Sequence, residues 1–198
     1  MIYLNDHIDE FDLQAALPLL SEQRRQQALK FKFDLGRKTC AAAYLLLCEG
    51  LRKEYGITER PLFEYGEHGK PTLLFTNHQS PFTRHQIHFN LSHCREAAIC
   101  VLDQQPVGID IESIREYKDS LARYTMNDEE LQRIASAERP DVEFTRLWTL
   151  KEAVLKCRGT GINNDIKNVL TGHENTETTV NLERGYVYSV AFSDLKSK

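Results

Sequence analysis

The segment over residues 141–156 constrains the fold most, because its apolar side chains recur with helical spacing and Arg158-Gly-Thr-Gly161 follows it. Glycines directly after such a run typically end a helix, so we expect one long helix here. Trp148, Glu152 and Lys156 are four residues apart and therefore share one side of it. The plainest explanation is a surface Glu–Lys pair beside a core tryptophan.

A second informative segment is Val107-Gly-Ile-Asp-Ile-Glu112, which has the alternation of a strand. Alternation separates the two isoleucines from Asp110 and Glu112, which share the other face. Gly108 lies on the acidic face, where we expect it to leave room for a ligand. Two acids at this spacing can offer oxygen ligands to Mg²⁺, although paired acids at an exposed strand end also serve solubility.

Glu152 adds a third carboxylate from within the apolar part of the helix. Three clustered carboxylates do not all stay ionised unless a cation neutralises them. We therefore expect Asp110, Glu112 and Glu152 to meet at a divalent cation that holds a phosphate, with Lys156 as a point charge on that phosphate.

Phe89-Asn-Leu-Ser-His-Cys94 closes another strand with polar side chains. Ser92 and His93 are not expected to form a nucleophile–base pair, because adjacent strand residues point to opposite faces. An anion-binding turn is the better functional interpretation, and Lys70 in the Gly69-Lys-Pro71 loop could add a cation. A histidine with a structural hydrogen bond is the alternative. No P-loop, dinucleotide-binding glycine pattern or Cys/His metal spacing is present.

The order of elements predicts an α+β fold of two similar halves, each a small antiparallel sheet packed against helices, divided as residues 1–105 and 106–198. Ser21 caps one expected helix, and Asn127 precedes another. Residues 87–91, 97–102 and 107–111 are closely spaced strand candidates, which favours antiparallel neighbours. The other expected elements are a helix over residues 37–52 and strands over residues 1–4, 72–75, 166–170, 178–182 and 186–192, with an exposed connection over residues 76–85.

Composition excludes several classes of function. The net charge is -4, whereas a general nucleic-acid binder would have a basic excess, so we expect no nucleic-acid partner. Basic residues such as Arg24 and Arg25 are compatible with a small anionic ligand, but a solvated helix face is the preferred interpretation. No run approaches the roughly 20 apolar residues of a membrane span, so no membrane partner is expected. Five cysteines without CxxC spacing predict a reduced, cytoplasmic protein in which each cysteine is a small buried apolar residue.

Four motifs in this order resemble those of the 4'-phosphopantetheinyl transferases. They are Gly69-Lys-Pro71, Phe89-Asn-Leu-Ser-His93, Val107-Gly-Ile-Asp-Ile-Glu112 and Trp148-Thr-Leu-Lys-Glu-Ala-Val-Leu-Lys156. The resemblance spans residues 37–161. It is to the longer type that activates peptide and polyketide synthases, a monomeric pseudodimer of two α/β halves, or to the related acyl-carrier-protein transferases.

The resemblance implies transfer of the phosphopantetheinyl arm of coenzyme A to a serine of an apo acyl or peptidyl carrier protein, with release of adenosine 3',5'-bisphosphate. Mg²⁺, or Mn²⁺ in its place, would be held by Asp110, Glu112 and Glu152. Glu152 or a metal-bound water would take the serine proton. Lys156 would stabilise charge on the phosphate, so the implied catalytic set is Glu152, Lys156 and Asp110. The implied residues for coenzyme A are Arg37, Lys70, Ser92, His93, Asp110 and Lys156.

Two other classes of function remain open at this point. A non-catalytic module that binds coenzyme A or a carrier protein would keep the fold, but it would be free to lose the acids and Lys156. A Mg²⁺-dependent nuclease or phosphohydrolase could use the same three acids. The acidic net charge and the lack of interleaved aromatic and basic residues disfavour nucleic acid.

Overall fold

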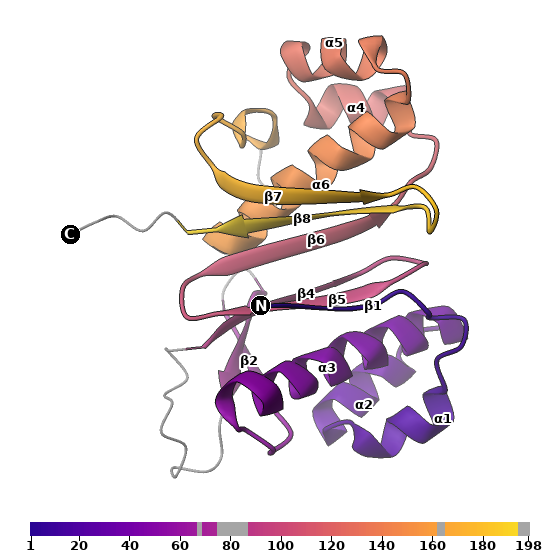
Figure 1. Ribbon diagram of the computed structural model, residues 1–198, viewed down its shortest axis with the longest axis vertical. Coiled ribbons are helices and arrows are strands. Elements are labelled where there is room, and N and C mark those ends of the chain that lie inside the picture. Colours follow the sequence, from indigo (N-terminus) through magenta and orange to yellow (C-terminus); the bar gives the residue numbers. More distant parts are fainter. Residues whose placement is uncertain (67–68, 75–86, 162–164, 194–198) are drawn as a thin grey trace, which may run out of the picture.

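The computed structural model describes residues 1–66, 69–74, 87–161 and 165–193. Figure 1 shows two layered halves stacked along the long axis, each with a small sheet and helices on one side. The expected α+β class with small antiparallel sheets is confirmed. Within the described residues, no helix has the length and apolar character that crossing a bilayer requires.

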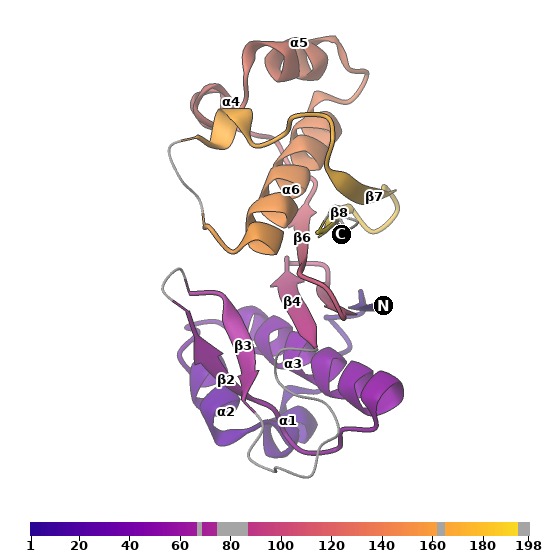
Figure 2. The same cartoon turned by 90° about the vertical axis from the view of Figure 1, so that its left-hand side faces the viewer.

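The first half packs α3 on the sheet β1-β5-β4, with α1 and α2 against α3, and the second half packs α6 on the sheet β6-β8-β7. A two-stranded hairpin, β2–β3, stands beside the first sheet (Figure 2). The first half contains β1 (Ile2–Asn5), α1 (Leu13–Ala16), a 3₁₀ helix (Leu17–Leu19), α2 (Glu22–Leu29), α3 (Asp34–Tyr55), β2 (Leu62–Tyr65), β3 (Pro71–Leu74), β4 (His88–His93) and β5 (Ala98–Asp103). The second contains β6 (Val107–Ser113), α4 (Asp119–Thr125), α5 (Asp128–Ser136), α6 (Pro140–Arg158), a 3₁₀ helix (Ile166–Asn168), β7 (Asn175–Asn181) and β8 (Tyr186–Phe192).

Local sequence signals account for most of these boundaries. The Ser21 hydroxyl accepts a hydrogen bond from the Arg24 amide and so caps α2 as expected. Asn127 and Glu130 form a reciprocal capping box at the start of α5. Gly159 ends α6 in the left-handed conformation, which glycine adopts at low cost because it has no Cβ.

Gly108 determines how closely α6 lies on β6. A Cβ at this position would be 2.1 Å from the Ala153 carbonyl oxygen and 2.3 Å from the Cys157 amide nitrogen. The expectation that Gly108 leaves room for a ligand is therefore wrong, because the space is filled by the backbone of α6. This close approach places the polar side of α6 beside the acidic face of β6.

The two sheets meet at β4 and β6. Here backbone amides of β6 donate hydrogen bonds to side chains of β4. The Ile109 amide donates to Asn90 Oδ1 at 2.9 Å, and the Ile111 amide donates to Ser92 Oγ at 3.3 Å. β4 and β5 pair antiparallel, as expected for close neighbours in the sequence. β6 does not continue that sheet, since its antiparallel partner is β8.

Other differences from the expected elements are local. The strand expected over residues 166–170 is wrong: Ile166–Asn168 form a 3₁₀ helix, and the buried Lys151 ammonium binds the carbonyl oxygens of Ile166 and Lys167. Helix α4 has no counterpart among the expected elements. The strand expected over residues 72–75 is β3, Pro71–Leu74. Residue 75 and the exposed connection expected over residues 76–85 lie outside the described residues.

Candidate active site

The Lys156 ammonium joins β4, β6 and α6 at one point. It donates to Asp110 Oδ1 at 2.5 Å, to Ser92 Oγ at 3.3 Å and to the Ile109 carbonyl oxygen at 3.3 Å. Ser92 Oγ also donates to Asp110 Oδ1 at 2.9 Å. The Asp110 side chain is buried and that of Lys156 is partly exposed, so the ion pair is shielded from water mainly on the carboxylate side.

The three predicted carboxylates lie close enough to perturb one another. Burial, and then the Asp110 charge, raise the pKa of both Glu112 and Glu152. A hydrogen bond from Trp148, which can only donate, acts in the opposite direction on the pKa of Glu112. The negative charge of Glu112 further raises the pKa of Glu152. The strand pair and the helix glutamate therefore share one electrostatic environment.

Two oxygens in this cluster lack a partner among the described residues. Asp110 Oδ2 and Glu152 Oε1 are buried without a hydrogen bond. Buried unpaired carboxylate oxygens are costly unless a cation or a proton neutralises them. Within the described part of the chain, no group of three or more His, Cys, Asp or Glu has the spacing of a formed metal site. The donor set fits a hard cation, and the predicted ligation by Asp110, Glu112 and Glu152 stays a prediction.

Ser92 and His93 point in opposite directions, as expected for neighbours on a strand: Ser92 is buried and His93 is exposed. The Ser92 hydroxyl has one proton and two lone pairs, and contacts with Asp110, Lys156 and the Ile111 amide use all of them. Although His93 reaches the surface, the protein around its ring and the Arg24 charge lower its pKa. Its ring contacts Phe31 edge-on, with centroids 6.3 Å apart.

The charged groups of Arg37 and Lys70 bind other partners than the three carboxylates. Arg37 is half-buried at the start of α3, where its guanidinium donates to the Phe31 carbonyl oxygen and to Asp34. Phe31, whose carbonyl oxygen accepts this hydrogen bond, also contacts the His93 ring. Lys70 directs its ammonium at backbone carbonyl oxygens of β6 and α6, and burial lowers its pKa.

Sequence reasoning missed two residues beside the cluster. Arg24 is 8% exposed and donates to the Cys40 carbonyl oxygen, so its interpretation as part of a solvated face is wrong. Its charge lowers the pKa of His93. In the sequence, nothing about a single arginine in a basic helix indicates that it is buried. Asn90 holds β6 through a side-chain acceptor, which the strand pattern does not reveal. Lys151 points away from the cluster and pairs with Glu130 at 2.8 Å.

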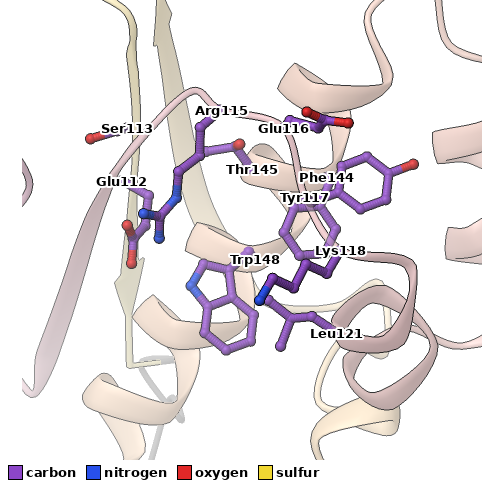
Figure 3. Close-up of a pocket in the computed structure, with 10 residues that line it drawn as sticks. All are labelled: Glu112, Ser113, Arg115, Glu116, Tyr117, Lys118, Leu121, Phe144, Thr145 and Trp148. Carbon is purple, nitrogen blue, oxygen red and sulfur yellow. The ribbon is translucent and has the colours of Figure 1, made fainter.

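Two cavities lie along the line formed by Trp148, Glu152 and Lys156. The larger, about 480 Å³, contains Glu112 and Trp148 in its wall, with the Tyr117 and Phe144 rings stacked (Figure 3). In Figure 3, Arg115 lies beside Glu112 and the Lys118 amine lies beside Trp148. The smaller cavity, about 220 Å³, is at the other end, lined among others by Lys70, Asn90, Glu152, Lys156 and Gly159. Glu112 thus lines the larger cavity and Glu152 lines the smaller one, so the carboxylate cluster lies between the two cavities.

Comparisons with known proteins agree with this geometry. A family model described as the 4'-phosphopantetheinyl transferase superfamily matches residues 106–197. The chain is 31% identical over 162 residues to 4'-phosphopantetheinyl transferase psf-1 of Bacillus pumilus, covering 80% of this chain and 66% of the relative. It is 33% identical to the transferase HetI of a Nostoc species, covering 77% and 65%, and 34% identical to the transferase gsp of Aneurinibacillus migulanus, covering 62% and 48%.

The aligned part of this chain thus spans between about half and two thirds of the length of these relatives. The family match covers the segment that contains both β6 and α6, the elements that carry Asp110, Glu112, Glu152 and Lys156. The chain belongs to the 4'-phosphopantetheinyl transferase superfamily.

Proposed function

We propose that this protein transfers the 4'-phosphopantetheinyl group of coenzyme A to a serine of an apo acyl or peptidyl carrier protein. The products are the holo carrier protein and adenosine 3',5'-bisphosphate. One observation carries the proposal: in a member of this superfamily, Asp110, Glu112 and Glu152 share one electrostatic environment, and Lys156 lies against Asp110.

In the proposed reaction, the serine oxygen forms a bond to the phosphorus that carries the pantetheine arm, and the bond from that phosphorus to the leaving bisphosphate breaks. Glu152 receives the serine proton. Its pKa is raised by burial and by Asp110, which brings a carboxylate closer to the pKa at which a general base works well. The three protons of the Lys156 ammonium are donated to Asp110, Ser92 and the Ile109 carbonyl oxygen. Lys156 would therefore act on the phosphate oxygens as a nearby positive charge.

The donor set fits Mg²⁺ or Mn²⁺, since two buried carboxylate oxygens lack partners among the described residues and two neighbouring carboxyl pKa values are raised. Asp110, Glu112 and Glu152 would hold the cation. When bound, it would neutralise the carboxylates and polarise the pyrophosphate. Ser92 holds Asp110 and Lys156 through its own hydrogen bonds.

The larger cavity and the basic groups around His93 suggest a direction for coenzyme A. The nucleotide end would occupy the side of His93 and Arg37, where the Arg24 charge adds positive potential. The pantetheine arm would extend toward the larger cavity beside Trp148, whose aromatic and aliphatic lining suits an uncharged chain. The carrier serine would then approach between the two cavities.

The site draws on both parts of the chain, because β4 supplies Ser92 and His93 while β6 and α6 supply the other groups. A single chain therefore suffices for the site, and we propose a monomer with halves at residues 1–105 and 106–198. The reduced cysteines and the coenzyme A donor are consistent with the cytoplasm as its location.

The test is intact-mass analysis of several apo carrier proteins, from fatty acid, polyketide and peptide synthesis, incubated with the protein, coenzyme A and Mg²⁺. At least one carrier should gain the mass of one phosphopantetheinyl group, and a chelator or Asp110→Asn should prevent the gain. Lys53→Met, which removes an exposed charge on α3, is the matched control and should remain active.

Two results would favour another class of function. Coenzyme A bound without modification of any carrier would indicate a binding module. Cleavage of coenzyme A without a modified carrier would indicate a phosphohydrolase.

A further inference from the structure

The Lys70 side chain connects the β2–β3 hairpin to the second half of the molecule. Its ammonium donates to the Lys156 carbonyl oxygen at 2.6 Å, to that of Cys157 at 3.1 Å and to that of Val107 at 3.4 Å. An ammonium has three protons, so three acceptors use its full capacity. Figure 2 shows the C-terminal end of α6 facing the hairpin.

Two of the three acceptors belong to the last turn of α6, which ends at Arg158. Carbonyl groups in the last turn of a helix lack partners within the helix and carry the negative end of its dipole. A cation is the most effective single partner for such a group of oxygens. The third acceptor, Val107, is the first residue of β6, so one ammonium ties the end of α6 to the start of β6.

These are the two elements whose relative position matters for chemistry. β6 carries Asp110, and α6 carries Glu152 and Lys156. Lys70 holds the backbone of Lys156, while the Lys156 side chain lies 2.5 Å from Asp110 Oδ1. The close contact at Gly108 involves the same part of α6, because a Cβ there would meet the backbone of Lys156 and Cys157.

We propose that Lys70 is a positioning residue that holds α6 on β6, and not a ligand of the coenzyme A phosphates as the family resemblance implies. To reach a phosphate, the ammonium would have to give up three hydrogen bonds to carbonyl oxygens. The geometry therefore assigns its charge to the helix end. The kinetic part of this inference depends on the proposed transferase activity, but the structural part does not.

The experiment compares wild type with Lys70→Met, which keeps the aliphatic stem and removes the donor, and with the control Lys53→Met. A misplacement of about 1 Å can cost up to about 100-fold in rate. Lys70→Met should lower kcat by about 10-fold to 100-fold and leave KM for coenzyme A within about twofold. Hydrogen exchange should accelerate at the end of α6 and the start of β6, whereas Lys53→Met should match wild type in every measurement.

A phosphate ligand would behave differently. If Lys70→Met raised KM for coenzyme A at least about tenfold with unchanged kcat and unchanged exchange in α6, the positioning role would be refuted. If the Met variant does not fold, Lys70→Gln, which keeps an amide donor, is measured in the same way. Wild type that modifies no carrier would overturn the proposed function alone, since hydrogen exchange still tests the link between Lys70 and α6.

Discussion

Replacing Gly108 by alanine perturbs the contact on which the whole site is built. The added Cβ would lie 2.1 Å from the Ala153 carbonyl oxygen, whereas ordinary van der Waals contact begins at 3.4 Å, so the two backbones must move apart. The Cys157 amide, at 2.3 Å, blocks a sideways escape. Overpacking a core typically costs about 1–3 kcal/mol, and because only backbone atoms are in the way we expect about 3 kcal/mol.

The free energy of unfolding of Gly108→Ala should therefore fall by about 3 kcal/mol in urea denaturation, with the melting temperature lower by roughly 6–12 °C for a chain of this size. Transfer activity should fall about 100-fold, because Glu152 and Lys156 move away from Asp110. Gly66→Ala is the matched control, since its nearest contact would be 3.8 Å away. A Gly108→Ala protein with the stability and rate of wild type would refute this account of the α6–β6 contact.

Three further predictions concern groups around the site. Lys151→Met should lower the free energy of unfolding by at least about 3 kcal/mol, because it leaves the Glu130 carboxylate buried without its cation; an unchanged urea midpoint would contradict this. Asn90→Ala should cost about 1–3 kcal/mol by the same measurement, since a buried amide of β6 loses its acceptor, and a neutral result would show that β4 does not hold β6 in this way. The raised pKa values of Glu112 and Glu152 mean that the folded, cation-free protein binds these protons up to a higher pH than the unfolded chain does. Their contribution to stability therefore falls as pH rises from 4.5 through the raised values, and protons compete with the cation. The increase in melting temperature caused by Mg²⁺ should thus shrink as the pH is lowered from about 8 to 5. A constant increase would argue that the cation binds elsewhere.

Much of the fold is readable from local signals. The cap at Ser21, the capping box at Asn127 and the glycine after Arg158 predict helix boundaries, because each satisfies backbone groups at a helix end. Alternation in β6 correctly places Asp110 and Glu112 on the same face. Helical spacing correctly places Glu152 and Lys156 on one side of α6.

The features that the sequence does not reveal depend on contacts between segments that are far apart in the chain. β6 pairs with β8, although the two strands lie near opposite ends of the second half of the chain. Closeness in the sequence therefore gives the wrong partner for β6. From the sequence alone, Gly108 suggests space for a ligand. In the structure, the backbone of α6 fills that space. Lys70 looks like a phosphate ligand because a lysine in a glycine loop usually has no other acceptors. Its three carbonyl partners lie 37, 86 and 87 residues away.

The central claim is that the acids of β6 and the glutamate of α6 bind one divalent cation, and calorimetric titration with Mn²⁺ in the presence of coenzyme A tests it most directly. Wild type should bind one Mn²⁺ per chain, and Asp110→Asn and Glu152→Gln should each weaken binding at least tenfold, or about 1.4 kcal/mol. Lys53→Met should bind as wild type does. Mn²⁺ binding by Glu152→Gln that equals wild type would show that α6 supplies no ligand, and the account would be wrong.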